Sequence, residues 1–330
     1  MMSVRDSLSP QEALAVMDTA QRIAIAGHIN PDGDALGSAL ALQSLLRAMG
    51  KDVTVLLGQD HAPPELYKFL PNYEFVWASE YSEVPDLFIV VDASTAKRLG
   101  NSERILGVAR DTLVIDHHTN YEGFAHHYIG DTMAPAAATL IWRIIKASGI
   151  TPTLDMATYC YVGIMTDTGR FAFKNTNASA FADASEMIGI GVDPAGLSEL
   201  VYENKTLPAL RLEALMTDRI QFSGAGSIAY SFILKDDLRT LGLERDVTEQ
   251  LPAILRAIKG VEVAALFREE GREGIRVNLR SRSSFNVGAF AREFGGGGHA
   301  GAAGLTLEQP LDEAISCVVE RLASELSAHT

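Results

Sequence analysis

Apolar and polar positions alternate in a regular way along the first 190 residues. Short apolar runs rich in β-branched residues recur, and each is long enough for one buried strand. These predicted strands cover residues 22–28, 51–57, 86–94 and 112–118. Helical patterns separate or follow them, at residues 35–50, 134–148, 153–166 and 177–189. Strands that alternate with helices predict an α/β fold with a mostly parallel sheet flanked by helices.

The pattern changes beyond this region. Residues 191–215 are helical and polar and include Pro194 and Pro208, which predicts a helical linker. A smaller α/β domain is predicted to follow, with strands at 227–234, 261–269 and 274–281 and helices at 246–258 and 311–327. The sequence therefore predicts two domains, residues 1–190 and 216–330, joined by the linker 191–215.

Composition narrows the classes of function. The chain has 330 residues and a net charge of −14, so it lacks the basic surface that tracking along DNA or long RNA requires. No apolar run approaches the roughly 18 residues that argue for a membrane span. The two cysteines, Cys160 and Cys317, are few for the length and favour a reducing compartment. We therefore expect a cytoplasmic protein without membrane association, in which any phosphate chemistry depends on a local site.

Acidic and histidine side chains follow the ends of three predicted strands. The residues in question are His28, Asp32 and Asp34 after the first strand, Asp92 after the third, and Asp116, His117 and His118 after the fourth. Asp167 follows a helical apolar stretch. Because the carboxyl ends of parallel strands meet at one edge of a sheet, we expect these side chains to converge. Turn formation and helix capping are the alternative roles for Asp32 and Asp34.

Converging carboxylates need a counter-charge, because like charges at close range raise one another's pKa. A pair of divalent cations would supply it. The mixture of carboxylate and imidazole suits Mn²⁺, with Mg²⁺, Co²⁺ or Fe²⁺ as alternatives. The sequence contains no CxxC motif, which argues against a zinc site built from thiolates.

A stretch rich in arginine and glycine lies near the C-terminus. Arg280 and Arg282 precede the sequence GGGGH, in which Gly296, Gly297 and Gly298 lead to His299. Glycine lets backbone N–H groups approach an anion closely, and guanidinium groups bind phosphate in a bidentate manner. A flexible linker is the alternative, but strand-like and helix-like patterns bound the stretch on both sides. We expect phosphate binding here, with Arg170 as a further phosphate partner.

The motifs HINPDGDALGS, VVDAS, IDHHTN, MTDTGRF and FGGGGHAGAAG together resemble those of the DHH/DHHA1 phosphoesterase family, in the family's order. The resemblance extends over nearly the whole chain. Within the family, the length is similar to that of the oligoribonucleases that also act as 3′-phosphoadenosine 5′-phosphate (pAp) phosphatases. It implies a DHH catalytic domain followed by a DHHA1 substrate-binding domain.

The resemblance also implies which residues hold the metals. Asp92 would bridge the two ions. The remaining ligands would be His28 and Asp32 for the first ion, and Asp34, His117 and Asp167 for the second.

Further roles follow from the same resemblance. His118 would face the substrate phosphate, Asp116 would orient the histidines, and the GGGGH segment would hold the substrate end remote from the metals. One segment departs from the family, which tends to carry serine and threonine where this chain has MAPAAATLIW at residues 133–142. Thr139 is the hydroxyl that remains there for contact with phosphate.

The expected reaction is hydrolysis of a phosphoester by water that two metals activate. The resemblance implies that RNA of two to about five nucleotides is cut to mononucleotides and that pAp is converted to AMP, short substrates being the ones an acidic surface tolerates. Linear or cyclic dinucleotides are alternative substrates, and a catalytically silent nucleotide-binding regulator is the alternative from another class. The oligomeric state stays open, although apolar helices such as 134–146 would support a homodimer.

Overall fold

The computed structural model describes residues 7–248, 251–270, 274–282, 284–298 and 300–328. The chain divides between Asn204 and Lys205 into two units, each with its own sheet. The expected fold class, an α/β domain with a parallel sheet followed by a second α/β domain, is confirmed.

The first unit is built on a sheet of six strands whose described pairings are all parallel. The strands are β1 (Arg22–Ala26), β2 (Asp52–Leu57), β3 (Val76–Trp77), β4 (Leu87–Val91), β5 (Asp111–Asp116) and β6 (His127–Gly130). Their order is β3-β2-β1-β4-β5-β6, so the chain moves outward from β1 in one direction and from β4 in the other. In sheets of this kind, ligands bind at the carboxyl ends of the strands where the order reverses.

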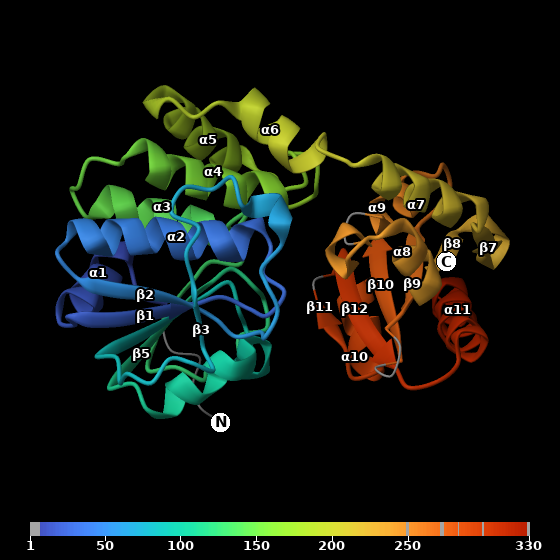
Figure 1. Ribbon diagram of the computed structural model, residues 1–330, viewed down its shortest axis with the longest axis horizontal. Coiled ribbons are helices and arrows are strands. Elements are labelled where there is room, and N and C mark those ends of the chain that lie inside the picture. The colour runs from blue at the N-terminus through green and yellow to red at the C-terminus, as the bar shows by residue number, and fades with distance from the viewer. Residues whose placement is uncertain (1–6, 249–250, 271–273, 283, 299, 329–330) are drawn as a thin grey trace. The chain divides into compact units, whose positions relative to one another are not determined.

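Helices lie on one side of this sheet. They are α1 (Pro10–Asp18), α2 (Gly33–Ala48), α3 (Ala137–Ala147), α4 (Leu154–Asp167), α5 (Ala178–Ile190) and α6 (Pro194–Tyr202). Helices α2, α3 and α4 lie side by side over the strands (Figure 1). The opposite face packs against the 3₁₀ segment η2 (Ala96–Gly107) and nearby loops, and a short 3₁₀ turn, η1 (Glu65–Tyr67), follows β2. Because both faces are covered, β4 is buried along its whole length.

Helices α2 and α4 pack unusually closely because glycines lie at their contact. A Cβ atom at Gly37 would lie 2.4 Å from the carbonyl oxygen of Tyr159 in α4, and one at Gly163 would lie 2.8 Å from Oδ1 of Asp34 in α2. Asp34 lies in α2, and α4 ends at Asp167. The close contact between the helices therefore sets the separation of these two carboxylates.

The second unit contains a mixed sheet in the order β11-β12-β10-β9-β8-β7. Its strands are β7 (Gln221–Ser223), β8 (Ile228–Ile233), β9 (Val263–Glu269), β10 (Ile275–Ser281), β11 (Gly297–Gly298) and β12 (Ala302–Leu307). Among the described pairings of this second sheet, only that of β8 with β9 is parallel.

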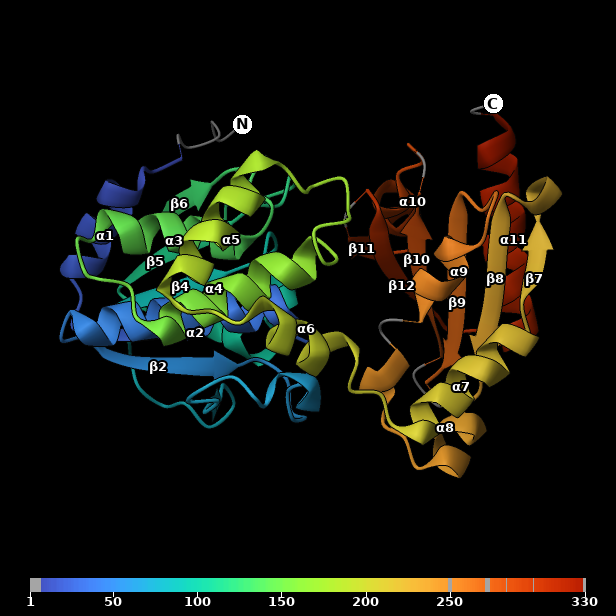
Figure 2. The ribbon, with the colours of Figure 1, turned by 90° about the horizontal axis from the view of Figure 1, so that it is seen from above.

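Helices cover both faces of the second sheet (Figure 2). One face packs against α10 (Val287–Glu293) and α11 (Leu311–Ala328), and the other against α7 (Leu207–Asp218), α8 (Lys235–Leu241) and α9 (Pro252–Ala257). Two 3₁₀ turns, η3 (Gly224–Gly226) and η4 (Arg245–Thr248), complete the unit.

Several elements differ from the sequence prediction. The predicted helix 246–258 is shorter, because α9 begins at Pro252, whose fixed φ suits the first turn of a helix. Strand β12 was missed because its sequence, AAGLTL, contains a single β-branched residue. The range 191–215 contributes α6 to the core of the first unit and α7 to that of the second, so the division between the units falls inside it.

The apolar residues of α3 do not support a homodimer. Leu140, Ile141, Ile144 and Ile145 are at most 2% exposed and belong to the core of their own unit. The suggestion that helix 134–146 offers an apolar face to a second copy was therefore wrong. Separately, the described residues contain no helix with the length and apolar character that crossing a membrane demands.

The tight contact of α2 with α4 leads to a stability prediction. Gly37→Ala should lower the free energy of unfolding by about 1–3 kcal/mol, because the new methyl group meets backbone that cannot retreat. Gly189→Ala is the matched control, since that helical glycine has nothing within 4 Å of its missing Cβ. The control should be neutral or slightly stabilising. Urea denaturation of both variants measures the difference, and equal stabilities would contradict the packing described above.

Candidate active site

The acid and histidine residues expected from the sequence lie at the carboxyl edge of the first sheet, where the strand order reverses. His28 follows β1, Asp92 follows β4, and Asp116 ends β5 immediately before His117 and His118. Asp32 is the N-cap of α2, and α2 and α4 contribute Asp34 and Asp167. The structure therefore brings together all the residues of the first unit that were assigned to the metals.

Asp92 is at the centre of this cluster. Its two carboxylate oxygens lie 3.4 Å from Nε2 of His28, 3.5 Å from Nε2 of His117 and 3.6 Å from Nδ1 of His118. Its backbone adopts a left-handed conformation, with φ of 54°. Such a conformation costs a non-glycine residue about 1–3 kcal/mol, and it is found where the surroundings impose it for function. Here it turns the carboxylate toward the three imidazoles.

The side chains form two sets of three potential ligands in which the ligand atoms lie within 4.8 Å of one another. The first set is His28, Asp32 and Asp92, and the second is Asp34, His117 and Asp167. A third combination joins Asp92 to His117 and His118. The first two sets correspond to the two groups that the family resemblance implies.

The imidazoles of His28 and His117 are oriented as ligands are. Nδ1 of His28 lies 2.8 Å from the carbonyl oxygen of Ile29, and Nδ1 of His117 lies 3.2 Å from that of Ala134. A bond from Nδ1–H to a carbonyl leaves Nε2 as the ring atom that faces the carboxylates, which is how metal-binding histidines are held.

The donor atoms also have the spacing that a metal needs. Nε2 of His117 lies 3.9 Å from an oxygen of Asp34 and 3.7 Å from one of Asp167. These distances exceed those of hydrogen bonds and lie between the separations of about 3 Å for adjacent and about 4 Å for opposite ligand atoms that are each about 2 Å from one ion. Oδ1 of Asp92 is buried and accepts no hydrogen bond within the described part of the chain. The residues therefore fit divalent cations.

Burial shapes the charges of the carboxylates. Burial, the largest influence, and the neighbouring Asp92 raise the pKa of Asp34 well above its ordinary value. Burial likewise raises the pKa of Asp167 to about 7. Burial alone would raise the pKa of Asp92, but its contacts with His117 and His28 outweigh burial and hold that pKa well below the ordinary value. A bound cation would stabilise the ionised form of every one of these groups.

The surrounding carboxylates favour the protonated, positively charged form of the histidines. Burial, the largest influence, and Arg98 lower the pKa of His28, but Asp32 and Asp92 outweigh them and raise it to about 9. Burial also lowers the pKa of His117, yet the surrounding aspartates raise it well above its ordinary value. Without a metal, protons therefore supply part of the positive charge that the carboxylates require.

Asp32 and Asp34 also have the capping roles that the sequence left open. Asp32 accepts hydrogen bonds from the first backbone N–H groups of its own helix, α2. Asp34 caps α3 instead, because its oxygens accept from the N–H groups of Ala137 at 2.6 Å and Ala138 at 2.9 Å. The N-cap residue of α3, Ala136, has no side chain for this purpose. Negative charge is favourable at a helix N-terminus, so Asp34 has a structural role beside its place in the cluster.

His118 lies between an acid and a guanidinium group. Its Nδ1 lies 2.6 Å from Oδ1 of Asp116, and Nη1 of Arg98 lies 3.2 Å from its Nε2. Asp116 is fully buried and so orients His118 from behind. Sequence reasoning missed Arg98, because it is neither at a strand end nor in a recognisable motif. The one sequence signal is a basic residue in the segment after Asp92.

Asn175 was also missed. Its Nδ2 lies 3.1 Å from Oδ2 of Asp167 and 2.9 Å from the carbonyl oxygen of Pro135. The amide therefore holds Asp167 against the segment that leads into α3. In the sequence, Asn175 lies in KNTN, which is typical of a turn and carries no other signal.

Thr139 is not available to a phosphate group. Its hydroxyl is fully buried, and Oγ1 has no hydrogen-bond partner within the described residues. The suggestion that Thr139 keeps the hydroxyl contact of this segment was therefore wrong. It faces the core because the segment becomes helix α3 one residue after Ala136.

Arg170 is exposed in the turn that follows Asp167. In the second unit, Arg276, Asn278 and Arg280 share the less buried side of β10, and Arg282 follows the strand and is exposed. Burial and the neighbouring Arg282 lower the pKa of Arg256 in α9, which indicates that these two guanidinium groups lie near each other. Positive charge is therefore concentrated locally in an acidic chain.

The glycine stretch owes its composition mainly to close packing. Gly297 and Gly298 form β11, and a Cβ atom at Gly296 would lie 2.3 Å from the carbonyl oxygen of Gly304. Gly295 and Gly298 have positive φ values, of 73° and 141°. His299 lies outside the described residues, so its predicted role in substrate binding stays a prediction.

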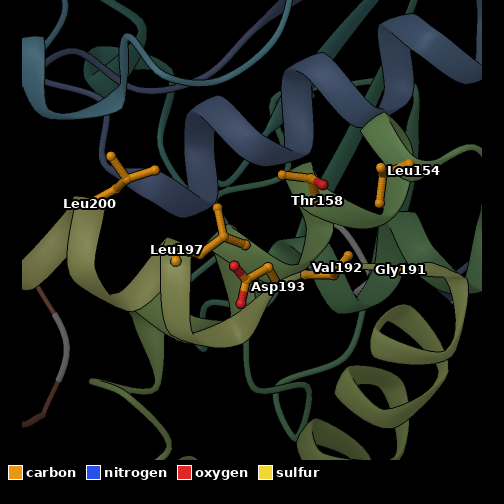
Figure 3. A pocket seen from close by; sticks show the side chains of 8 residues that line it. Leu154, Thr158, Gly191, Val192, Asp193, Leu197 and Leu200 are labelled. Atoms are coloured by element: carbon orange, nitrogen blue, oxygen red, sulfur yellow. The ribbon is translucent and has the colours of Figure 1, made fainter.

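An apolar surface hollow of about 260 Å³ lies elsewhere on the first unit, between the starts of α4 and α6 (Figure 3). It is lined by Leu154, Thr158, Gly191, Val192, Asp193, Gly196, Leu197 and Leu200. The carboxylate of Asp193 caps α6 by accepting from the N–H of Ala195 at 3.1 Å. The hollow contains none of the clustered acids and histidines, so it is distinct from the candidate active site.

Known proteins share this organisation. Residues 22–164 match the N-terminal domain of the DHH family, and residues 225–327 match the DHHA1 domain. A Thermus thermophilus protein, the bifunctional oligoribonuclease and PAP phosphatase NrnA, is 33% identical over 92% of this chain and 90% of its own length. The Bacillus subtilis protein of the same name is 28% identical over 90% of this chain and 92% of its own length. The crystal structure of an exopolyphosphatase-related protein from Bacteroides fragilis has a TM-score of 0.88 at 26% identity, covering 96% of this chain and 97% of that one.

The raised pKa values predict that metal binding releases protons. Near pH 7.5, His28, with a pKa of about 9, and His117 carry protons that they must lose before Nε2 can bind a cation. Mn²⁺ affinity should therefore rise from pH 7 to pH 9. Isothermal titration in buffers of different ionisation enthalpy should detect about one proton or more released per site.

The control for this titration is Asp111→Asn. Asp111 pairs with His126 and His127 at the other ends of the strands, so its removal should leave the proton release unchanged. Metal binding with no net release of protons would contradict the orientation and charge described for His28 and His117.

Proposed function

Because this chain belongs to the DHH/DHHA1 family and is a metal-dependent phosphoesterase, we propose that it cuts RNA of two to about five nucleotides to mononucleotides and converts pAp to AMP. The two domain matches and the Thermus relative confirm the family resemblance of the motifs. The observation that carries the proposal is the grouping of six potential ligands around Asp92. The names of the Thermus and Bacillus relatives, which align along about nine tenths of this chain, support the choice of substrates.

The proposal assigns the cluster to two divalent ions, Mn²⁺ by the mixture of carboxylate and imidazole donors. His28 and Asp32 would hold one ion, and Asp92 would be shared between both. The second ion would be held by Asp34, His117 and Asp167. Mg²⁺ and Co²⁺ are the alternatives. Divalent cations at such a site supply positive charge that activates water and polarises phosphoryl oxygens.

The protein groups around the cluster would then orient and stabilise the reacting phosphate. A water oxygen forms the new bond to phosphorus while the ester P–O bond breaks and the departing oxygen takes up a proton. Asp116 orients His118 through Nδ1, and the Arg98 guanidinium, which lies at Nε2 of that ring, is placed to donate to phosphoryl oxygens of a substrate that His118 faces. Positive groups fixed before the reaction lower the barrier, because they need not reorganise as charge develops.

The second unit would supply the remaining contacts. We assign phosphate or nucleotide binding to Arg280, Arg282 and the segment Gly296–Gly298, with His299 as an additional contact. The net charge of −14 makes the long-range field of the chain repulsive to phosphates. Each further phosphate of a long strand would therefore meet repulsion. We therefore expect a preference for short substrates.

The low cysteine content supports a cytoplasmic location. The acidic net charge argues against tracking along long DNA and against binding to a membrane. A homodimer stays a prediction without support from α3.

The direct test supplies purified protein with pAp and with 5′-labelled RNA, in the presence and absence of Mn²⁺. Release of AMP and of mononucleotides that depends on the metal is the expected result. A protein that hydrolyses bis-p-nitrophenyl phosphate with Mn²⁺ but neither nucleotide would retain the phosphoesterase assignment and lose the proposed substrates.

The second prediction on function concerns substrate length. Initial rates should be greatest on RNA of two to about five nucleotides and decline on strands of about 12 and 24 nucleotides. Raising the salt concentration should help the longer strands slightly relative to the shorter ones, because it screens repulsion from the acidic surface. A rate that rises with length and collapses with salt would instead indicate a nuclease that tracks along long strands.

Asp92→Ala should abolish turnover and leave the fold intact. Within the described residues, no other carboxylate lies within 4 Å of a histidine in each group of ligands, and the buried oxygen that is lost accepts no hydrogen bond there. Asp111→Ala is the control for removal of a carboxylate that pairs with histidines away from the site. Rates with pAp and thermal unfolding of both variants give the comparison. Retention by Asp92→Ala of more than about a tenth of the wild-type rate, a loss of roughly 1.4 kcal/mol or less, would rule out the shared-ligand role.

A further inference from the structure

The turn that follows Asp167 has an unusual backbone. Gly169, Arg170 and Phe171 are all left-handed, with φ values of 55°, 62° and 59°. Two successive non-glycine residues in this conformation are strained, and such strain persists only where the surroundings determine it. The turn lies directly after a residue of the acid–histidine cluster, so its shape decides where the Arg170 side chain begins.

Hydrogen bonds and ring packing hold this turn in place. The N–H of Arg170 donates to the carbonyl of Met165 at 2.8 Å, and the N–H of Phe171 donates to Oγ1 of the buried Thr168 at 3.1 Å. The ring of Phe171 stacks on that of Phe181, with centroids 5.3 Å apart. Phe171 thus packs on the core of the first unit while Arg170 is exposed.

Tyr202 provides the surface on which the Arg170 guanidinium lies. Cζ of Arg170 is 4.7 Å from the centroid of the Tyr202 ring. Tyr202 ends α6, packs against the core, and its hydroxyl donates to the carbonyl of Met165 at 3.3 Å. The same carbonyl therefore accepts from both the Arg170 backbone and the Tyr202 side chain, which links α6 to the turn.

The ring also lies within electrostatic reach of the cluster. Burial, the largest influence, raises the pKa of Tyr202 to about 12, with smaller contributions in the same direction from Asp167 and Asp32. The phenol therefore stays neutral and its ring keeps the electron-rich face that attracts a cation.

Stacking on an aromatic ring leaves an arginine able to bind an anion. A guanidinium group stacks through its face, whereas it donates hydrogen bonds from its edge. Within the described residues, no carboxylate forms an ion pair with Arg170, so no acid of that part of the chain engages its edge. A carboxylate in place of Tyr202 would occupy those donors, and a flexible side chain would not orient them.

We propose that Tyr202 is a positioning residue that holds the Arg170 guanidinium beside the acid–histidine cluster, with its edge directed to a phosphate oxygen of the substrate. The proposal deepens the function proposed above and rests on it, because it needs an anionic substrate at this cluster. It also gives α6 a role in substrate binding, although no residue of that helix belongs to the cluster.

The test is a double-mutant cycle on the full-length protein with Mn²⁺ and pAp. Tyr202→Leu and Tyr202→Met remove the ring, Tyr202→Phe keeps it, and Arg170→Ala removes the guanidinium. Loss of the ring should lower kcat/KM about threefold to tenfold, mainly through KM, which is the effect expected of one cation–π contact. Tyr202→Phe should stay within about twofold of the wild type, because the face of the ring is retained.

The Arg170→Ala background separates positioning from folding. Removing the ring there should change kcat/KM by less than about twofold, since the group that it positions is already absent. Equal losses in both backgrounds, or a Tyr202→Phe variant as impaired as Tyr202→Leu, would overturn the proposal. So would wild-type kinetics in both ring-free variants.

Two further measurements keep the outcome interpretable. Thermal unfolding identifies a ring-free variant that does not fold. If neither Tyr202→Leu nor Tyr202→Met folds, Arg170→Lys takes their place, because it keeps the charge and loses the planar stack. Wild-type kinetics in Arg170→Lys would then overturn the proposal. If wild-type protein hydrolyses bis-p-nitrophenyl phosphate but not pAp, the proposed substrates fail, and the same cycle on the artificial ester still decides the role of Tyr202.

Discussion

Several carboxylates are buried around Asp92, and most features of the first unit accommodate their charge. Removing one ionised carboxylate from water costs several kcal/mol, and placing others beside it adds repulsion. The structure meets this cost with imidazoles at 3.4 to 3.6 Å from Asp92 and with raised pKa values at Asp34 and Asp167. Divalent cations would replace those protons. The same constraint that makes the site costly to fold makes it selective for strongly positive ligands.

The carboxylates are also part of the framework that surrounds them. Asp34 caps α3, and its helix α2 meets α4 through glycines that allow backbone contact. Asn175 connects Asp167 to the segment before α3. A shift of any of these helices would therefore move a ligand. Rigid packing of this kind is what holds catalytic groups within the small tolerances that chemistry requires.

The arginines discussed above each lie beside a particular neighbouring side chain. Arg98 contacts His118, Arg170 stacks on Tyr202, and Arg282 lies near Arg256 in the second unit. An acidic chain that binds phosphates cannot depend on a general attraction, because its long-range field repels them. Under the proposed function, binding would depend instead on a few guanidinium groups, of which Arg98 and Arg170 are held by His118 and Tyr202. Such an arrangement would favour small anions, whose few charges a few fixed groups can satisfy.

The sequence by itself determined the parallel sheet and the residues at its carboxyl edge. The sequence shows local properties directly, namely the period of its apolar positions, its β-branched runs and the motifs around Asp92 and His117. The alternation of strands and helices then restricts the fold to few arrangements. Only the tertiary structure identified Arg98, Asn175 and Tyr202, and only it showed that Thr139 is buried. These four depend on which segments meet in space. Contacts between residues far apart in the chain leave no periodic trace, so the sequence indicated where chemistry occurs and the packing decided which neighbours serve it.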